Sequence, residues 1–560
     1  MIGKRVLAGT SGAKFGNLRF ATSGLPNFRT TTVAAIETPC LPNIRATSES
    51  CLPNSWTTRS AHSEPACLPC VGTTTPVTLG TICLPGTSET SCLPSIGATT
   101  LSWRTSRRGF ASYSAVLDYG EVPTPKGLPV IGTTLSLILA GGPKKLHKYI
   151  DRRHTELGSI FKDNVGPVTA VFVSEPEEMR KVFANEGKYP VHIKPEAWLV
   201  YNKKHDCTRG LFFMDGEDWL TYRRKMNRLL LKGDLTWIEE CCEASNDVFL
   251  EQIARTSGQE FGDLERRLYK WSTDTVLAVL MGAESYRTNY KKIENLATIL
   301  ADDVKQVFET TCKLQLIPAT LAEKSNISRW KTFERTVTRA LNTANQTLDF
   351  LDKYVEKDEG LLVKMREEGI EDDKMRTIVV DLMLGAGDTT SNTMVWALYL
   401  LGRNTEMQDS LRKDLGDSML RNTVKETLRL YPAAPFLTRV LPDAIAVGGY
   451  QIPRHTLIVM SIYTSGRDKR FFTDPEEFMP ARWCRDYSAA TPLQQNASLP
   501  FGIGARSCVG RKIAEAQLQG ALGRILREYK IQLCDEKQIE DVLEMITKPE
   551  RPVKLTFNKI

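Results

Sequence analysis

The chain has 560 residues, of which 41% are hydrophobic and 25% charged, so it can bury one large core and still carry an appendage. Its net charge is +7, but residues 1–110 hold ten Lys and Arg against four Asp and Glu, leaving 63 against 62 for the remainder. Because the remainder is nearly neutral and has no basic block interleaved with aromatic residues, the composition argues against nucleic-acid binding.

The first 110 residues differ in composition from the rest of the chain. They are rich in Ser, Thr, Gly and Pro and keep no helical or strand period, so we predict that they are disordered. A Cys-Leu-Pro sequence recurs there, at Cys40, Cys51, Cys67, Cys83 and Cys92. The irregular spacing without histidine partners argues against a zinc site, and no secretory signal supports a disulfide framework.

The same segment has the composition of a targeting sequence. Residues 1–36 carry five Lys or Arg, no acidic residue and no long apolar stretch, as is typical of organellar transit peptides. Arg108 stands three residues before Ala111, which resembles a cleavage site of the mitochondrial processing peptidase. We therefore expect 1–110 to be a cleavable mitochondrial presequence and 111–560 to be the catalytic domain.

Helical patterns follow in the middle of the chain. Trp219 and Arg223 are spaced i, i+4, so both side chains reach one side of a helix. Several amphipathic helices alternate with polar loops over residues 246–353. Within them, residues 314–321 form an apolar patch that is core, part of a substrate entry, or a surface that touches a membrane.

Residues 381–402 are almost continuously apolar. Asp381, Asp388, Thr389, Thr390 and Asn392 interrupt them and would be costly in lipid, so we predict a buried helix rather than a membrane span. Asp388 and Thr389 either supply protons to a reaction or are polar residues satisfied by helix carbonyls.

Charged pairs mark the next predicted helix. Glu426 and Arg429 lie i, i+3 and can pair, while Arg421 and Lys425 lie i, i+4 on a face that is either solvated or a docking surface. Pairs of this kind are common by chance in charged helices.

The most specific pattern is a glycine-rich loop, residues 501–510, that carries Cys508 directly before an amphipathic helix. The unpaired N–H groups of a helix N-terminus lower the pKa of a thiol and favour the thiolate. A thiolate is one of the ligands that hold haem iron. Gly504 and Gly510 leave room for a tight loop beside a flat ring. The alternative is a structural cysteine beside a turn.

The loop matches the F-x-x-G-x-R-x-C-x-G signature of cytochromes P450, which the chain resembles from about Pro125 to its C-terminus. The proline-rich segment 123–132 resembles the hinge that begins P450 catalytic domains. The resemblance implies a mainly α haem-thiolate fold, with a large helical domain and small β sheets. It implies haem b as the cofactor, with Cys508 as the axial iron ligand.

The resemblance also implies roles for other residues. Asp388 and Thr389 match the pair that delivers protons on the distal side of the haem, and Phe501 would shield the sulfur. Residues expected to contact the haem or its propionates are Trp219, Arg223, Arg439, Arg506 and Gly510. Glu426, Arg429 and Arg482 would form a structural triad beneath the thiolate, with Ala481 at a position that is usually acidic.

Electrons would come from a separate protein, because the chain has no flavin or nicotinamide module. Mitochondrial P450s use an adrenodoxin-like ferredoxin, itself reduced by an NADPH-dependent reductase. Its expected docking residues here are Arg421, Lys425, Arg511 and Lys512. The connection between Gly402 and Lys425 is shorter than is usual for the family.

We therefore predict a mitochondrial monooxygenase that uses O2 to hydroxylate a lipophilic, steroid-like molecule. It would lie on the matrix side of the inner membrane and contact that membrane peripherally. The repeats near the N-terminus favour an invertebrate, molluscan member. Three alternatives stay open: a microsomal-type enzyme served by a diflavin reductase, a haem-thiolate isomerase or lyase, and a haem-binding sensor or carrier without catalysis.

Overall fold

The computed structural model describes residues 116–129, 131–165, 168–315, 317–355, 360–413, 415–484 and 492–560. All of them belong to one unit, Ser106–Ile560, with its own core. The predicted presequence, its cleavage site and its Cys-Leu-Pro repeats lie outside the described residues.

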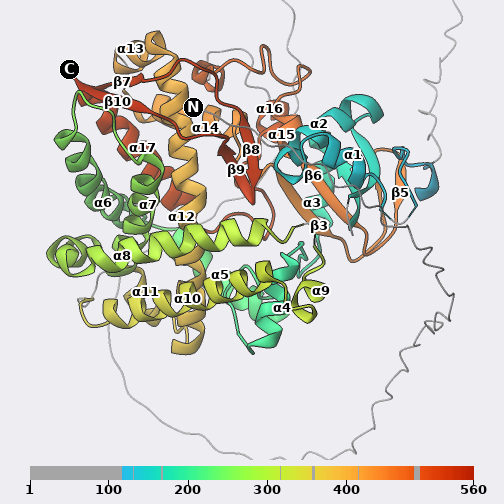
Figure 1. Ribbon diagram of the computed structural model, residues 1–560, viewed down its shortest axis with the longest axis horizontal. Coiled ribbons are helices and arrows are strands. Elements are labelled where there is room, and N and C mark those ends of the chain that lie inside the picture. The colour runs from blue at the N-terminus through green and yellow to red at the C-terminus, as the bar shows by residue number, and fades with distance from the viewer. Residues whose placement is uncertain are drawn as a thin grey trace, which may run out of the picture. The chain divides into compact units, whose positions relative to one another are not determined.

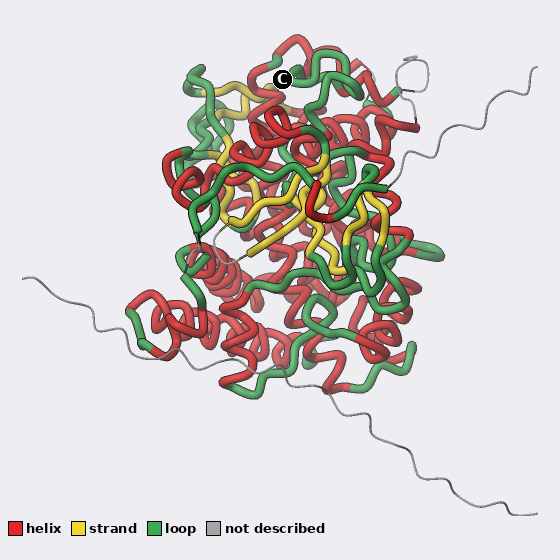
Figure 2. Tube along the Cα trace, turned by 90° about the vertical axis from the view of Figure 1, so that its right-hand side faces the viewer, coloured by secondary structure: helices red, strands yellow, loops and turns green. Residues whose placement is uncertain are grey.

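Helices make up most of the described chain (Figure 1; red in Figure 2). The α-helices are α1 (Thr134–Leu139), α2 (Leu146–Leu157), α3 (Pro176–Ala184), α4 (Glu196–Lys204), α5 (Gly216–Leu231), α6 (Thr236–Arg255), α7 (Leu264–Met281), α8 (Ala283–Cys312), α9 (Ala319–Lys324), α10 (Ser328–Leu351), α11 (Gly360–Glu367), α12 (Asp372–Arg403), α13 (Thr405–Lys413), α14 (Asp417–Leu430), α15 (Ile462–Ser465), α16 (Pro492–Ala497) and α17 (Arg511–Glu528). Short 3-10 helices are η1 (Tyr119–Glu121), η2 (Pro143–Lys145) and η3 (Pro480–Trp483).

The strands form small sheets beside these helices, as expected. One sheet has the order β1-β2-β6-β3, in which only the β2–β6 pair is parallel. The other sheets are the antiparallel pairs β4–β5, β7–β10 and β8–β9. The strands are β1 (Ile160–Val165), β2 (Val168–Val173), β3 (Phe436–Val440), β4 (Ile445–Val447), β5 (Tyr450–Ile452), β6 (Leu457–Ser461), β7 (Tyr529–Leu533), β8 (Asp541–Glu544), β9 (Ile546–Pro549) and β10 (Leu555–Lys559).

The long helix α12 organises the helical part of the molecule. It contains the whole apolar stretch predicted to be a buried helix, and it packs against α7, α8, α10 and α14 (Figure 1). Nearly every side chain from Gly387 to Leu401 is buried, so apolar residues on all sides of the helix meet protein. Near its C-terminal end, the Trp396 ring stacks on Tyr431, with ring centroids 3.7 Å apart, and fixes α12 against the end of α14.

The short connection between α12 and α14 contains one helix, α13, which packs against α17 and β7. Gln408 anchors it: the buried amide donates to the carbonyls of Leu401 and Ile531, at 2.7 and 2.8 Å, and accepts from the Ile531 N–H. Although the connection is short, it is firmly held, because the hydrogen bonds of one buried side chain join α12, α13 and β7.

Within the described ranges no helix is long and apolar enough to cross a membrane. The apolar patch expected at residues 314–321 divides in the structure: Leu314 is buried in the core, whereas Leu321 is 57% exposed. A second group of exposed apolar side chains lies on α1, where Leu135, Ile138 and Leu139 share one helical face.

Candidate active site

The loop that carries Cys508 is closed by its own backbone. The Cys508 N–H donates to the Phe501 carbonyl at 2.8 Å, and Phe501 itself is half-buried. Gly502 and Gly504 have φ of +66° and +80°, a region that side chains strongly disfavour. The loop ends at Gly510, the N-cap of α17, whose N–H lies against the Cys508 sulfur.

Glu186 ties this loop to the four-stranded sheet. Its carboxylate accepts the Ala505 N–H at 2.6 Å and pairs at 2.6 Å with the Arg439 guanidinium on β3. A Cβ at Gly504 would collide with the same carboxylate, so glycine is required there for space as well as for φ. Arg439 therefore has an internal counter-charge, and both charged side chains are buried.

Two more arginines hold the loop from the side of α5. Arg223 donates to the Ser507 carbonyl at 2.5 Å. Arg506 donates to the carbonyls of Pro190, Leu211 and Met214 and pairs with Asp215 at 2.9 Å. Its guanidinium lies 4.2 Å from the centre of the buried Trp219 ring. Trp219 and Arg223 thus meet the cysteine loop from one side of α5, as their spacing predicts.

Positive charge exceeds negative charge around this loop. Four cations (Lys194, Arg223, Arg439 and Arg506) accompany two carboxylates (Glu186 and Asp215), an excess of two positive charges. His192 lies among them, and burial together with the charges of Arg506, Lys194 and Arg439 lowers its pKa to about 3. Neither ring nitrogen of His192 nor the Nε of Arg223 has a hydrogen-bond partner in the described chain.

Cys508 is accessible to solvent, but the protein around its sulfur raises the pKa of the thiol. The Gly510 N–H and the charges of Arg223 and Arg511 lower the pKa, but burial outweighs them. The helix N-terminus therefore lowers the pKa of the thiol, as expected, but in the described chain it does not outweigh burial. Binding to a metal ion would remove the proton.

The turn of α12 around Gly385 has an open side. Gly385 is exposed although the helix beyond it is buried, and no atom lies within 4 Å of a Cβ built there. Thr389 is half-buried, and its hydroxyl donates to the Gly385 carbonyl at 3.4 Å. Asp388 is fully buried and pairs at 3.1 Å with Lys548 on β9. Burial raises the pKa of Asp388 to about 6, although Lys548 opposes this.

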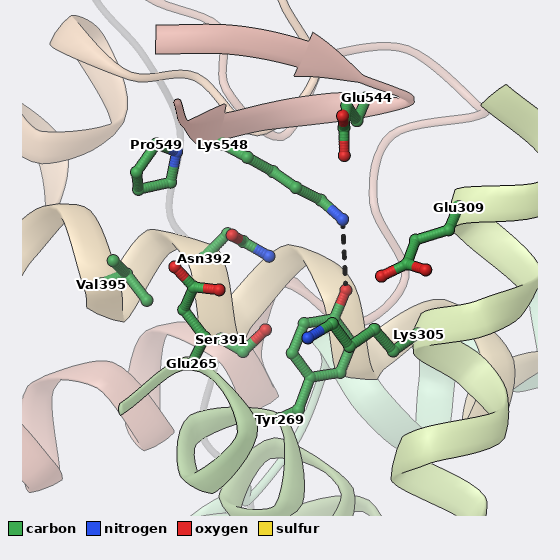
Figure 3. A pocket seen from close by; sticks show the side chains of 10 residues that line it. All are labelled: Glu265, Tyr269, Lys305, Glu309, Ser391, Asn392, Val395, Glu544, Lys548 and Pro549. Carbon is green, nitrogen blue, oxygen red and sulfur yellow. Dashed lines mark hydrogen bonds between the residues drawn. The ribbon is translucent and has the colours of Figure 1, made fainter. Parts of the chain in front are cut away.

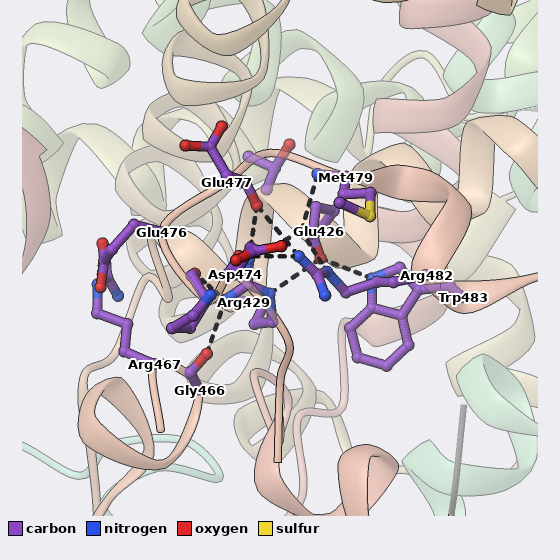
Figure 4. A network of polar contacts seen from close by, with 12 residues as sticks. Glu426, Arg429, Gly466, Arg467, Asp474, Glu476, Glu477, Met479, Arg482 and Trp483 are labelled. Carbon is purple, nitrogen blue, oxygen red and sulfur yellow. Dashed lines mark hydrogen bonds and ion pairs between the residues drawn. The ribbon is translucent and has the colours of Figure 1, made fainter. Parts of the chain in front are cut away.

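A buried network centres on Glu426 of α14 (Figure 4). Its carboxylate accepts hydrogen bonds from Arg429 at 2.8 and 2.9 Å and from Arg482 at 2.8 Å. It also accepts from the Trp483 indole and the Met479 N–H. Both guanidinium groups complete their bonding with loop carbonyls, those of Gly466, Thr473, Asp474, Pro475 and Glu477. The structure thus brings the predicted triad together.

Cations gather on the exposed side of the same helix. Arg421 and Lys425 are exposed, and the pKa of Lys425 is lowered by burial of its stem and by the charges of Arg421 and Arg511. Arg511 and Lys512 begin α17 and share Glu515, at 3.5 and 3.4 Å. The Lys425 ammonium lies 5.7 Å from the centre of the Trp483 ring. We call Arg421, Lys425, Arg511 and Lys512 the α14–α17 basic patch.

The cytochrome P450 family model matches residues 122–557, which is most of the chain. The chain belongs to the cytochrome P450 family. P450s are haem-thiolate monooxygenases, so the protein is an oxidoreductase whose cofactor is haem held by a cysteine.

Several mitochondrial P450s are similar to this one. Cytochrome P450 315a1, mitochondrial, of Drosophila melanogaster is 37% identical over 78% of this chain and 88% of its own length. The mitochondrial cholesterol side-chain cleavage enzyme of Oncorhynchus mykiss is 28% identical, over 80% and 91%. The mitochondrial sterol 26-hydroxylase of Homo sapiens is 26% identical, over 75% and 86%. The chain is thus related to mitochondrial P450s that include sterol-metabolising enzymes.

The residues around Cys508 fit a haem. Haem carries two propionates, and the two excess positive charges beside the loop would balance them. His192 and the Nε of Arg223 have the unused hydrogen-bonding capacity that such carboxylates need. The loop at Cys508 and the turn of α12 at Gly385 are both exposed, so each has a surface that the described protein does not cover.

Sequence reasoning missed three residues of this P450 site: Glu186, His192 and Lys548. Glu186 and Lys548 lie 253 and 160 positions from their charged partners, and no local spacing connects them. The signal that could have found Glu186 and His192 is the Gly- and Pro-containing loop before α4 in which both lie, residues 186–192, with the sequence Glu-Gly-Lys-Tyr-Pro-Val-His.

The Glu426 network gives a stability prediction. In Glu426→Ala two buried guanidinium groups lose their counter-charge, and breaking a buried pair in this way costs about 3–5 kcal/mol. We expect a markedly lower midpoint of thermal unfolding by circular dichroism. Glu477→Ala is the matched control, because it removes an exposed carboxylate of the same loop and keeps the carbonyl that the arginines use. Equal midpoints for the two variants would contradict the prediction.

Proposed function

We propose that this P450 is a mitochondrial monooxygenase that hydroxylates a lipophilic, steroid-like molecule, with Cys508 as the haem ligand. The observation that carries the proposal is the solvent-exposed residue Cys508 beside a cluster with two uncompensated positive charges. Haem bound through a thiolate supplies the chemistry that cleaves dioxygen. One oxygen atom enters the substrate, and the other leaves as water with two protons and two electrons.

The residues of this chain would bind the cofactor and supply protons. The Nε of Arg223 and the ring of His192, which have no hydrogen-bond partner in the described chain, would receive one propionate. Arg439 and Arg506 would balance the charge of both. Thr389 on the open side of α12 would pass protons toward oxygen, and the buried Asp388 would resupply it. The Glu426 network would hold the loop beneath Cys508 rigid.

Electrons would arrive at the α14–α17 basic patch from an acidic ferredoxin, reduced in turn by its NADPH-dependent reductase. The patch lies on the helix that carries Glu426 and at the start of the helix that follows Cys508. Charges of one sign at a docking surface steer an oppositely charged partner and speed its association. The mitochondrial relatives support this kind of partner over a diflavin reductase.

We place the enzyme on the matrix side of the inner mitochondrial membrane, as a peripheral protein. Its mitochondrial relatives and the basic, acid-poor N-terminus support the compartment. The exposed face of α1, with Leu139 81% exposed, supports contact with lipid and gives a lipophilic substrate a place to arrive. In this proposal residues 1–110 are the cleaved presequence and 111–560 the catalytic domain.

The ligand assignment predicts a spectrum. Reduced protein under carbon monoxide should show the red-shifted Soret band of thiolate-ligated haem, and Cys508→Ser should lose it. Cys534→Ser is the control, because it removes another exposed free thiol and should keep the band. A histidine-type spectrum in the wild-type protein, or an unchanged band in Cys508→Ser, would overturn the assignment.

The docking patch predicts a loss of electron transfer without a loss of haem. Arg421→Glu with Lys425→Glu should slow reduction by ferredoxin at least ten-fold in stopped-flow measurements and leave the carbon monoxide band intact. The wild-type rate should fall as salt rises, because charges are screened within roughly 8 Å at physiological ionic strength.

Lys291→Glu with Lys331→Glu is the control for the docking variant. It makes the same charge change at exposed positions on α8 and α10 and should keep the wild-type rate. Equal rates in all three proteins, or turnover only with a diflavin reductase, would favour the microsomal-type alternative.

The presequence proposal predicts where the mature protein begins. After import into isolated mitochondria, mass spectrometry should find an N-terminus at or near Ala111, and Arg108→Ala should reduce that cleavage. An intact Met1 end on the working protein would instead favour the haem-binding sensor or carrier.

A further inference from the structure

We propose that Lys548 and the polar pocket beside it form the route by which protons from solvent reach Asp388, with Lys548 as the residue that positions and tunes this carboxyl group. The inference deepens the proposed monooxygenase function and rests on it. Lys548 comes from the C-terminal hairpin β8–β9, more than 150 positions away from the helix that it serves.

Asp388 is held on one side only. Its Oδ1 pairs with the Lys548 ammonium at 3.1 Å and accepts from the Asn392 amide at 3.3 Å. Its Oδ2 is buried and has no hydrogen-bond partner in the described part of the chain. A buried carboxylate oxygen without a partner is costly, so this atom has capacity to bind a proton or a water molecule.

The pocket lies where α7, α8, α12 and the β8–β9 hairpin meet (Figure 3). Its volume of about 150 Å³ gives room for several water molecules. Lys548 reaches down from the hairpin, and its ammonium lies 3.5 Å from the Tyr269 hydroxyl. The pocket is lined by Glu265, Tyr269, Lys305, Glu309, Ser391, Asn392, Val395, Glu544, Lys548 and Pro549.

Lys548 therefore stands between the pocket and the carboxyl group. Its side chain is 13% exposed, whereas that of Asp388 is fully buried, so solvent reaches the ammonium first. Successive helix residues point about 100° apart. Asp388 consequently faces the hairpin while Thr389 faces the open side near Gly385. The carboxyl group lies between the polar pocket and the hydroxyl that would pass protons onward.

The charges around Asp388 suit a proton relay. Lys548 lowers the pKa of the carboxyl group and Glu544 raises it, and with burial the result is about 6. Glu265 and Tyr269 on α7 and Lys305 and Glu309 on α8 are the other titratable groups of the pocket. A donor with a pKa near the working pH transfers protons efficiently, and pocket water restores the proton that Asp388 gives up.

Replacing Lys548 should change the shape of a pH profile. Without the ammonium the pKa of Asp388 rises. As a weaker acid it gives up its proton more slowly, but it stays protonated to higher pH. Lys548→Met should therefore slow proton delivery several-fold below pH 6 and move the alkaline decline to higher pH. A structural defect alone would lower the rate by the same factor at every pH and would leave the shape of the pH profile unchanged.

The test uses haem-loaded enzyme with ferredoxin, reductase and NADPH, and needs no identified substrate. Dioxygen that leaves as peroxide consumes one NADPH and one proton, whereas dioxygen reduced to water consumes two NADPH and two protons. The rate of the water-forming branch, measured from NADPH, oxygen and peroxide between pH 5.5 and 8.5, reports proton delivery to oxygen. In wild-type enzyme it should decline through about pH 6, the pKa of Asp388.

Three variants give the comparison. Lys548→Arg keeps the charge and should restore the wild-type profile. Lys291→Met removes an exposed lysine of α8 that does not line the pocket and should leave the profile unchanged, whereas Lys548→Met should show the altered shape. A Lys548→Met profile that is parallel to or superimposed on the wild type would overturn the proposal. Absence of the carbon monoxide band in wild-type protein would instead overturn the proposed function, and the two failures are therefore distinguishable.

Discussion

The buried carboxylate of Glu426 is the contact on which the arrangement of residues 466–483 around α14 depends. It accepts five hydrogen bonds, from Arg429, Arg482, Trp483 and the Met479 backbone. The two arginines then bind five carbonyl groups of residues 466–477. A loop without regular structure is thus held by charge-assisted bonds in a dry environment, where such bonds are strong and removal of one partner is costly.

A second set of charges positions the cysteine loop itself. Glu186 connects it to β3 through Arg439, and Arg506 connects it to residues 190–215. These contacts use most of the guanidinium donors internally and still leave two positive charges in excess. The arginines that fix the loop are therefore the same groups that would attract the propionates of the haem. One cluster of charged side chains would serve both the structure of the loop and the binding of the cofactor.

The sequence could predict what depends on local spacing. The fold class, the long helix α12, the Glu426–Arg429 pair and the loop before α17 follow from periodicity and from a specific motif, and the structure has them where expected. The partners of Asp388 and Arg439 could not be predicted, because Lys548 and Glu186 reach them only through tertiary packing.

The pKa of Cys508 shows a further limit of sequence reasoning. A helix N-terminus lowers the pKa of a thiol, but the pKa of Cys508 also depends on burial by the folded chain and on charges of α5 and α17. The rule about helix N-termini gives the right direction for the contribution of the Gly510 N–H, which lowers the pKa. It does not give the direction of the total shift, because burial raises the pKa by more. Residue types and spacing therefore identify a candidate ligand, but its charge state depends on the folded environment.

Helix α14 has the α14–α17 basic patch on one side and the Glu426 network on the other, with Trp483 in contact with both Lys425 and Glu426. A partner that docks on this surface therefore presses on a helix whose far side is already fully bonded. Such a helix has little freedom to shift when charge moves past it. For a redox partner docked here, such rigidity would keep the reorganisation energy of electron transfer small, and the rate would depend on how often the partner arrives rather than on how far the protein must relax.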